Sequence, residues 1–388
     1  MKVKSCYSTQ LDPYRAGAEI GEQLAEIQPE VVFLFPTIHY GGSPELAEAL
    51  YDALGSDDAI VFGNSGDGFY ERDKVAEVGV SALGISTNGL ARWRVEHEAG
   101  LGADPRGTTM RCMERLHASG DLESPALYFL AADFRTDTTA ITEALRETAR
   151  GPVVGGSAAD DMRLQSCFVH AGREVLTDSI AILTMDGDVP FELRLAHALP
   201  LVGTPGRITR CEGTMLHEVD GMPAMSFIER ELGKPLDAVD VGLTTLEVRS
   251  GERPEERQLR SLWLLERDGP DGSVELFGGV NEGDRVQVCL APPDHLVRDV
   301  KEVADSLDDL PFRPTAGLVI GCTGRKQLLG GDLQKELREL VERCPSLEAV
   351  AGYPSFGEYC PVRSGTGYSL PLFHNMTLAM VLFGEHPS

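Results

Sequence analysis

The sequence predicts a mixed α/β protein of two domains, in which duplicated strand–helix–strand repeats and hairpins form mixed sheets covered by helices. Its 388 residues are more than one hydrophobic core usually accommodates. Hydrophobic residues make up 42% and charged residues 25% of the chain, as in ordinary globular proteins. A pattern of apolar strands, an amphipathic helix and a glycine-rich turn recurs along the chain, which indicates internal duplication.

The first copy of this pattern lies near the N-terminus. An apolar run at residues 31–35 predicts a buried strand, and leucines at helical spacing predict a helix at 44–54. A second apolar run at 59–62 leads into the glycine-rich turn at 63–68. Carboxylates in this turn would repel a phosphate, so we interpret it as a tight chain reversal.

The second copy follows the same order and adds two strands after its turn. A strand at 126–130, a helix at 138–150 and a strand at 152–154 are followed by the small and polar residues 155–161. The pattern continues with strands near residues 166–170 and 179–185.

The third copy is fainter and lies near the C-terminus. Its expected parts are a strand at 316–320 leading into 321–325, a helix at 332–343, a strand at 349–353 leading into 354–358, and a closing strand at 378–383. Single helices between strands favour mixed sheets with helices packed on a face.

The segment from residue 207 to 290 follows a different pattern. Short strands are expected at 263–266, 274–277 and 286–290, with an Asp271-Gly272 turn between the first two. Glycine and proline cluster near residues 200–205. The sequence therefore predicts a first domain at 1–200 and a second at 201–388.

Charge and hydropathy exclude several functional classes. The 35 basic and 61 acidic residues give a net charge of -26, which would repel a nucleic acid backbone. No apolar run approaches the roughly 20 residues of a membrane helix, and the N-terminus lacks a signal peptide pattern. The eight cysteines form no Cys-x-x-Cys pair, so we expect reduced thiols, no zinc site and a cytoplasmic location.

Several short motifs, in this order, resemble the FIST family of F-box and intracellular signal transduction proteins. The motifs are Gly155-Gly156-Ser157, the segment 218–224, Cys322-Thr323-Gly324-Arg325, Gly357-Glu358 and the segment 373–377. The resemblance implies a stand-alone sensory module with FIST N and FIST C domains. It also implies an amino-acid-like ligand or, in some bacterial members, haem, and a signalling partner such as a histidine kinase.

Arg325 and Glu358 are the first candidate ligand-binding residues. The planar guanidinium of Arg325 could grip a carboxylate in bidentate fashion. The alternative is structural, because Glu358 also lies at a strand end of the third copy and could form a buried ion pair with Arg325.

Cys322 and His374 are candidates for chemistry. A nearby guanidinium could lower the thiol pKa of Cys322, although a buried structural thiol is the favoured interpretation. His374 is the residue expected to bind haem, if haem is present, because imidazole is a common axial ligand. Asn375, Gly357 and Ser157 complete the set of candidate ligand-binding residues.

The leading hypothesis is a sensory module that binds a small metabolite or haem between its two halves, with no nucleic acid or membrane partner. No catalytic residue is assigned. The alternatives are a cysteine-dependent enzyme using Cys322 and a protein-interaction scaffold without a small ligand. All three hypotheses are compatible with the sequence.

Overall fold

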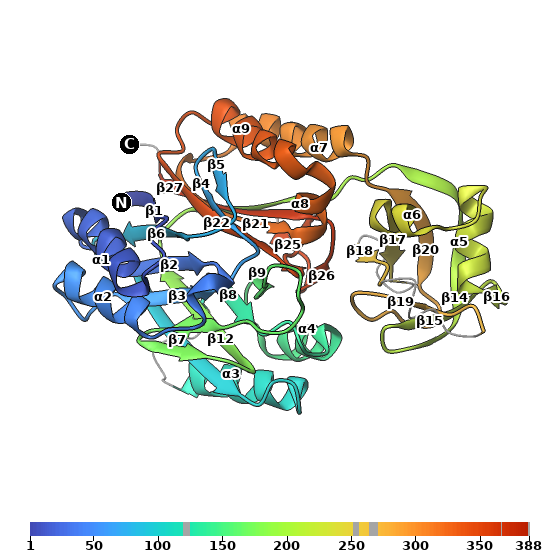
Figure 1. Ribbon diagram of the computed structural model, residues 1–388, viewed down its shortest axis with the longest axis horizontal. Helices are drawn as coiled ribbons and strands as arrows, with labels where there is room; N and C mark the ends of the chain where they lie inside the picture. Colours follow the sequence, from blue (N-terminus) through green and yellow to red (C-terminus); the bar gives the residue numbers. More distant parts are fainter. Residues whose placement is uncertain (119–124, 251–255, 264–270, 366, 387–388) are drawn as a thin grey trace.

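The structure is a computed structural model that describes residues 1–118, 125–250, 256–263, 271–365 and 367–386. Figure 1 shows a large part formed by residues 1–199 and 293–386, with a smaller part, residues 200–292, on one side of it. We call these parts the body and the small domain. The small domain is inserted between strand β13 and helix α7 of the body.

Three six-stranded sheets form the body, and each contains the same four-strand core. In this core, an edge strand lies next to a second strand that runs antiparallel to it. The second strand lies next to a parallel pair, which supplies the third and fourth strands. In sheet one the order is β1 (Lys2–Ser8), β6 (Val80–Ser86), β2 (Val31–Pro36) and β3 (Ile60–Asn64). In sheet two it is β7 (Ala91–Ala99), β12 (Ser179–Gly187), β8 (Leu127–Ala132) and β9 (Val153–Ser157). In sheet three it is β13 (Phe191–Ala196), β27 (Leu378–Glu385), β21 (Arg313–Cys322) and β22 (Ala349–Ser355).

The last two strands of each sheet come from a different copy of the repeat. Sheet one ends with β10 (Val169–Ala171) and β11 (Glu174–Leu176) from the second copy. Sheet two ends with β23 (Glu358–Tyr359) and β26 (Phe373–His374) from the third. Sheet three ends with β4 (Phe69–Glu71) and β5 (Lys74–Ala76) from the first. The three copies therefore interlock in a closed cycle.

Glycine makes the parallel pairs compact at one equivalent position in each copy. Gly63, Gly155 and Gly352 lie in the second strand of the three pairs. A Cβ at any of these positions would lie within 2.0 Å of a backbone carbonyl oxygen of the neighbouring strand. Any larger residue would push the two strands apart.

Helices cover the outer faces of the three sheets (Figure 1). Sheet one carries α1 (Pro13–Leu24) and α2 (Glu45–Leu54), and sheet two carries α3 (Pro105–Ala118) and α4 (Thr138–Thr148). Sheet three carries α7 (Pro293–Asp305), α8 (Thr323–Leu329) and α9 (Leu333–Arg343). A short two-stranded ribbon, β24 (Arg363–Ser364) and β25 (Gly367–Tyr368), lies apart from the sheets.

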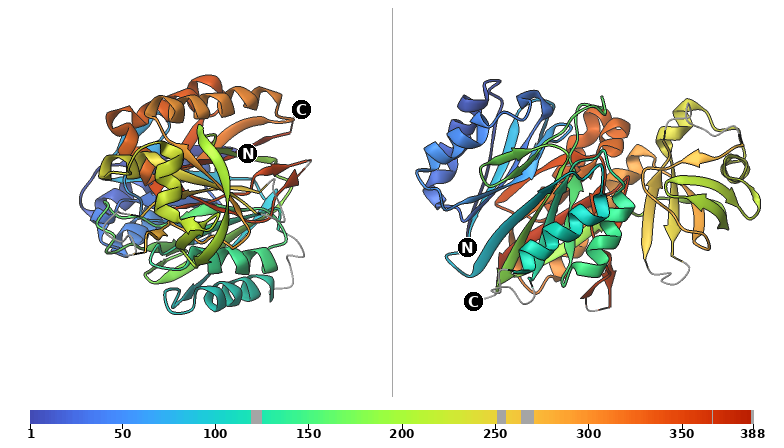
Figure 2. Two further views of the ribbon diagram at one scale, coloured as in Figure 1. Left: turned by 90° about the vertical axis from the view of Figure 1, so that its right-hand side faces the viewer. Right: turned by 90° about the horizontal axis from the view of Figure 1, so that it is seen from below.

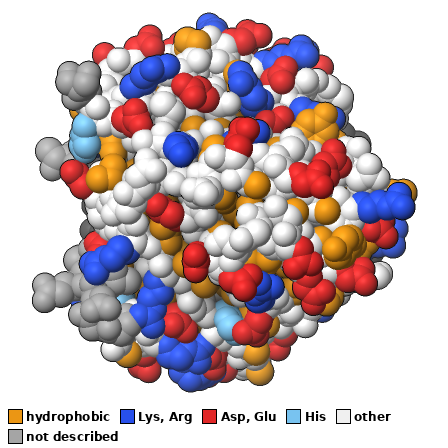
Figure 3. All heavy atoms as spheres, turned by 90° about the vertical axis from the view of Figure 1, so that its left-hand side faces the viewer, with side chains coloured by type: hydrophobic (Ala, Val, Ile, Leu, Met, Phe, Trp, Pro, Cys, Tyr) orange, Lys and Arg blue, Asp and Glu red, His pale blue; other side chains and the backbone are white. Residues whose placement is uncertain are grey.

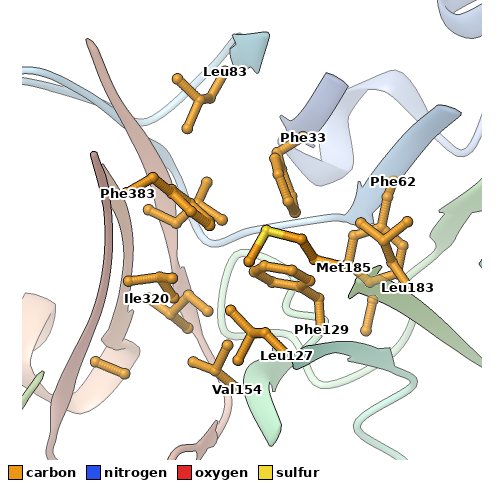
Figure 4. Packing of buried hydrophobic residues seen from close by; sticks show 14 of the residues in the cluster. Phe33, Phe62, Leu83, Leu127, Phe129, Val154, Leu183, Met185, Ile320 and Phe383 are labelled. Atoms are coloured by element: carbon orange, nitrogen blue, oxygen red, sulfur yellow. The ribbon is translucent and has the colours of Figure 1, made fainter. Parts of the chain in front are cut away.

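The inner faces of all three sheets meet in one hydrophobic core. Figure 4 shows Phe33 of sheet one, Phe129 of sheet two and Phe383 of sheet three pointing into this shared space. The rings of Phe33 and Phe129 lie 5.0 Å apart, a distance typical of favourable aromatic pairs. The body is therefore one packing unit.

The small domain has a seven-stranded sheet and its own hydrophobic core. Its strands are β14 (Leu201–Glu212), β15 (Met215–Val219), β16 (Met222–Pro223), β17 (Thr244–Arg249), β18 (Arg257–Ser261), β19 (Val274–Glu275) and β20 (Arg285–Leu290). Helices α5 (Ala224–Leu232) and α6 (Ala238–Leu243) complete it. The right-hand view of Figure 2 shows the small domain beside the body.

The predicted fold class is confirmed, since mixed sheets are flanked by helices throughout. The strand–helix–strand pattern of all three copies is present, and the strand predicted at 166–170 begins only at Val169. Most of the strand predicted at 263–266 lies outside the described residues. The domain limits 1–200 and 201–388 stay a prediction, and strands from both ranges pair in sheets two and three.

Candidate functional site

A cavity of about 610 Å³ lies where the small domain meets the body. Its volume lies within the range of small-molecule sites. The body contributes the loop between β8 and α4 (residues 134–138), Ser157, Leu164, Phe356 and Phe373. The small domain contributes residues 212–214, Trp263 and residues 275–278.

Aromatic side chains form much of the lining on both sides. On the small-domain side, the Trp263 and Phe277 rings lie 4.2 Å apart. On the body side, the Phe134 and Phe356 rings lie 4.9 Å apart in an edge-to-face arrangement. Together with Phe373, these rings offer an apolar surface that a flat or aliphatic ligand group could contact.

Ser157 supplies a buried hydroxyl to this cavity. It is 1% exposed. Its hydroxyl lies beside the buried Tyr359 hydroxyl, and hydrogen bonding with Ser157 acts against the burial that raises the pKa of Tyr359. A hydroxyl can donate one hydrogen bond and accept others, so Ser157 can also contact a polar ligand group in the cavity.

Arg135 is the cationic group of the cavity. Its Nε and one Nη bind the two oxygens of Asp133 at 3.1 and 2.8 Å. The hydrogen bond to Asp133 raises the pKa of Arg135. Because the side chain of Arg135 is 44% exposed, a charged ligand group could reach it without displacing Asp133.

Several polar contacts join the small domain to the body beside this cavity. The backbone N–H of Gly279 donates to Thr139 Oγ1 at 2.8 Å. Arg146 of α4 forms an ion pair with Glu256 at 2.8 Å. Arg260, which is buried, donates to the carbonyl oxygen of Phe373 at 2.6 Å.

Most of the predicted site residues gather around residues 373–377, where they hold the chain in place. Glu358 is fully buried, and its carboxylate accepts hydrogen bonds from Ser355 Oγ at 2.7 Å and Thr377 Oγ1 at 2.8 Å. Glu358 also lies opposite His374 in the ladder between β23 and β26. Burial raises the pKa of Glu358 to about 8.

Arg325 lies inside α8 with its side chain fully buried. Its Nε donates to Glu336 at 3.0 Å, and its two Nη atoms donate to the carbonyl oxygens of Met376 and Leu296 at 3.2 and 3.0 Å. Glu336 is therefore the partner of Arg325, and the predicted pair with Glu358 is wrong. This pair was not predicted from the sequence, because Glu336 is one of several acidic residues along α9 and no local pattern distinguishes it.

Cys322 is buried beneath the same segment, and its backbone N–H donates to the carbonyl oxygen of Thr377 at 3.0 Å. Burial raises the pKa of its thiol, and the Glu358 carboxylate raises it further. A thiol in this environment is a poor nucleophile at neutral pH. The geometry gives no support to a cysteine-dependent reaction at Cys322.

His374 does not fit an axial haem ligand. Its ring is fully buried, and its Nε2 lies 2.9 Å from the carbonyl oxygen of Cys360. Burial lowers the pKa of His374 well below its usual value. The junction cavity is lined by Phe373 and not by His374, whereas a haem ligand must face a wide cavity.

The remaining predicted residues connect this segment to its surroundings. Asn375 Oδ1 accepts from the backbone N–H of Ser261 in the small domain at 3.2 Å. Gly357 accepts from the backbone N–H of Ser157 at 2.9 Å, and a Cβ on Gly357 would lie 2.3 Å from the Phe373 ring. Of the seven predicted ligand-binding residues, Ser157 alone lines the junction cavity.

Sequence reasoning missed Phe134, Arg135, Trp263 and Phe277. One available signal was Trp263, since the chain has only two tryptophans and this one begins the strand predicted at 263–266. The others follow strands in loops whose convergence depends on the tertiary fold. Their local sequences contain no motif.

Family models match nearly the whole chain. The FIST N domain matches residues 30–222, and the FIST C domain matches residues 224–361. The uncharacterized protein MJ1623 of Methanocaldococcus jannaschii is 24% identical over 221 residues, which is 55% of this chain and 43% of that protein. The chain thus spans less than half the length of this curated relative.

Solved structures with detectable similarity are distant. Cyanuric acid hydrolase from A. caulinodans aligns over 99% of both chains with 9% identity and a TM-score of 0.37. PurL from T. maritima, complexed with ATP, aligns over all of this chain and 73% of its own with 12% identity and a TM-score of 0.21. These similarities carry no functional argument. Within the described residues, no helix has the length and hydropathy needed to cross a membrane.

Proposed function

Because the chain belongs to the FIST family, whose domains are sensory modules of signal transduction, we propose that it senses a small metabolite in the cavity between the body and the small domain. The main support for this proposal is the cavity of about 610 Å³ with aromatic groups on both sides. A ligand that touches both parts would favour one arrangement of the small domain over others. A signalling partner, such as the predicted histidine kinase, would bind differently to the arrangement that the ligand favours.

The lining favours a ligand of the amino-acid class with an apolar side chain. Trp263, Phe277 and Phe134 offer an apolar surface, and Ser157 offers a buried hydroxyl. Arg135 could attract a carboxylate, and Glu212 on the opposite wall could attract an ammonium group. The charges of an amino acid therefore have complementary groups in one cavity.

The junction has the construction that such a sensor requires. Two chain segments, 197–200 and 291–292, connect the small domain to the body. The contacts beside the cavity include the hydrogen bond to Thr139 and the ion pair of Arg146 with the buried Glu256. Because one hydrogen bond contributes about 1 kcal/mol net, a ligand that contacts both parts through several groups adds stabilisation of the same order as these contacts.

Tryptophan fluorescence tests the proposal directly. Trp93 lies in the body beside Phe33 and Phe129, so a Trp93→Phe variant leaves Trp263 as the reporter. Each of the twenty protein amino acids is added in turn while emission and melting temperature are recorded. We expect at least one to change the Trp263 emission and to raise the melting temperature.

Two variants assign that response to the cavity. Ser157→Ala should weaken binding because it removes the hydroxyl that lines the cavity, whereas Ser56→Ala, which removes a distant exposed hydroxyl, should leave binding unchanged. An amino acid that stabilises the protein equally in Ser157→Ala and Phe277→Ala variants would place the site elsewhere. No response to any amino acid would reject the ligand class.

A further inference from the structure

A row of arginines crosses the sheet of the small domain. Arg207 of β14 lies opposite Arg285 of β20, and Arg285 lies opposite Arg249 of β17. Arg249 in turn lies opposite Arg257 of β18. Residues directly opposite in a sheet point to the same face, so four guanidinium groups share one side. We call these four residues the arginine row.

Like charges directly opposite each other destabilise a sheet. Such a row is unexpected in a chain with only 35 basic residues against 61 acidic ones. On the face of the body shown in Figure 3, for comparison, acidic and basic side chains are interspersed. The concentration of one sign on four adjacent strands therefore calls for a negatively charged partner.

An internal carboxylate satisfies only half of the arginine row. Glu247, which is 3% exposed, forms ion pairs with Arg249 and Arg257, each at 2.7 Å. Arg207 and Arg285 are exposed. Across the described part of the chain, neither of these two has a carboxylate within ion-pair distance, and Arg207 Nε donates to the carbonyl oxygen of Gly283 at 3.2 Å.

Two hollows flank Arg285. The first, of about 350 Å³, lies between Arg207 and Arg285 and is also lined by Asp220. The second, of about 260 Å³, lies between Arg285 and Arg249 and is also lined by Glu247. Each hollow is bordered by two arginines, and Arg285 belongs to both. The surface is thus shaped for two anionic groups held side by side.

We propose that the arginine row binds an acidic peptide segment of a partner protein through two carboxylates. Adjacent strands lie about 4.8 Å apart, and side chains on one face of an extended peptide recur about every 6.8 Å. Long arginine side chains bridge this difference, and their forks match carboxylates in bidentate fashion. The site is separate from the junction cavity, because the two share no lining residue.

An acidic peptide is the informative probe, because a chain with a net charge of -26 repels it everywhere except at a local basic site. A fluorescein-labelled peptide of alternating Glu and Ala is titrated with the full chain at low ionic strength, and binding is followed by anisotropy. The control peptide has Gln in place of every Glu. We expect binding of the Glu peptide only, and weaker binding as salt is added.

Arg285→Gln should weaken binding of the Glu peptide about tenfold or more, because it removes charge-assisted hydrogen bonds in both hollows. The matched control is Arg210→Gln on the same strand as Arg207. Arg210 is an exposed arginine outside the hollows that pairs with Glu218, and we expect less than about a twofold change in binding. Arg285→Lys should retain more affinity than Arg285→Gln because it keeps the positive charge. It should not retain all of it, because lysine lacks the planar guanidinium that binds a carboxylate in bidentate fashion.

Stability separates binding from a structural role. Since Arg285 is flanked by two like charges, Arg285→Gln and Arg207→Gln should leave the melting temperature unchanged or raise it. A lower melting temperature in both variants would assign the row a structural role and overturn the proposal. The proposal would also be overturned if the Glu peptide bound Arg285→Gln as tightly as it binds the unmodified protein. The same holds if inorganic pyrophosphate bound to the protein and the Glu peptide did not displace it.

Discussion

A buried ion pair of the body contrasts with an exposed arginine pair of the small domain. In the body, Arg325 and Glu336 form an ion pair at 0 and 1% exposure. In the small domain, Arg207 and Arg285 lie exposed and side by side. A buried pair fixes the chain around it because neither charge can be left alone, whereas exposed charges of one sign are available to a partner. The motifs of the body therefore make architectural contacts, and our two proposals place recognition in the small domain and its junction.

Removing Arg325 should destabilise the protein more than any other substitution proposed here. A small loss of stability would contradict the contrast drawn between the two regions. Arg325→Ala leaves Glu336 buried without its partner, so we expect a loss of about 3–5 kcal/mol in unfolding free energy. Denaturant unfolding measures this change. Arg338→Ala, an exposed arginine on α9, is the matched control and should change stability by less than about 0.5 kcal/mol. A small loss in Arg325→Ala would mean that water reaches Glu336.

The pH dependence of stability tests Glu358, another buried acidic group of the body. Glu358 has an ordinary pKa of 4.5, and burial raises it to about 8 in the folded protein. The folded state then binds a proton more tightly than the unfolded state. The resulting stabilisation is complete below about pH 4.5 and is lost as the pH rises to about 8.

Unfolding of Glu358→Gln across this range isolates that contribution, which we expect to be on the order of a few kcal/mol. The variant stays neutral, so its stability should fall less steeply between pH 5 and 8 than that of the unmodified protein. Parallel curves for the two proteins would mean that Glu358 is ionised in the fold.

Gly357→Ala should have an intermediate effect that reaches from the body to the junction. The new Cβ would lie 2.3 Å from the Phe373 ring, and overpacking of this kind costs about 1–3 kcal/mol. Because Phe373 lines the cavity, ligand-induced stabilisation should fall as well. Gly331→Ala is the control, since a Cβ there meets no atom within 4 Å. Unchanged stability in Gly357→Ala would show that Phe373 moves freely.

Thr139→Ala should have the smallest effect on stability. It tests the contact between the small domain and the body at the junction. It removes the acceptor of the Gly279 N–H and should cost about 0.5–1.5 kcal/mol. Hydrogen exchange should rise at residues 278–280 and leave the sheets of the body unchanged. The control is Thr148→Ala, whose hydroxyl bonds only within α4 to the carbonyl oxygen of Ala144. Faster exchange throughout the body would contradict a separable small domain.

Local patterns were sufficient to predict the repeated units. Leucine spacing predicted α2, and the capping position of Asp137 agrees with the start predicted for α4. Helices α1, α3, α7 and α8 were not predicted, because their apolar residues lie in no recognised repeat.

By itself, the sequence determined the three strand–helix–strand copies, the mixed α/β class and the family, because local periodicity and short motifs record each of them. The tertiary structure alone decided that the copies exchange strands, that Arg325 pairs with Glu336, and that Phe134 meets Trp263 around one cavity. It also aligned Arg207 with Arg285, residues separated by most of the small domain. Strand register between distant segments is set by the whole packed core, and no local pattern of residues records it.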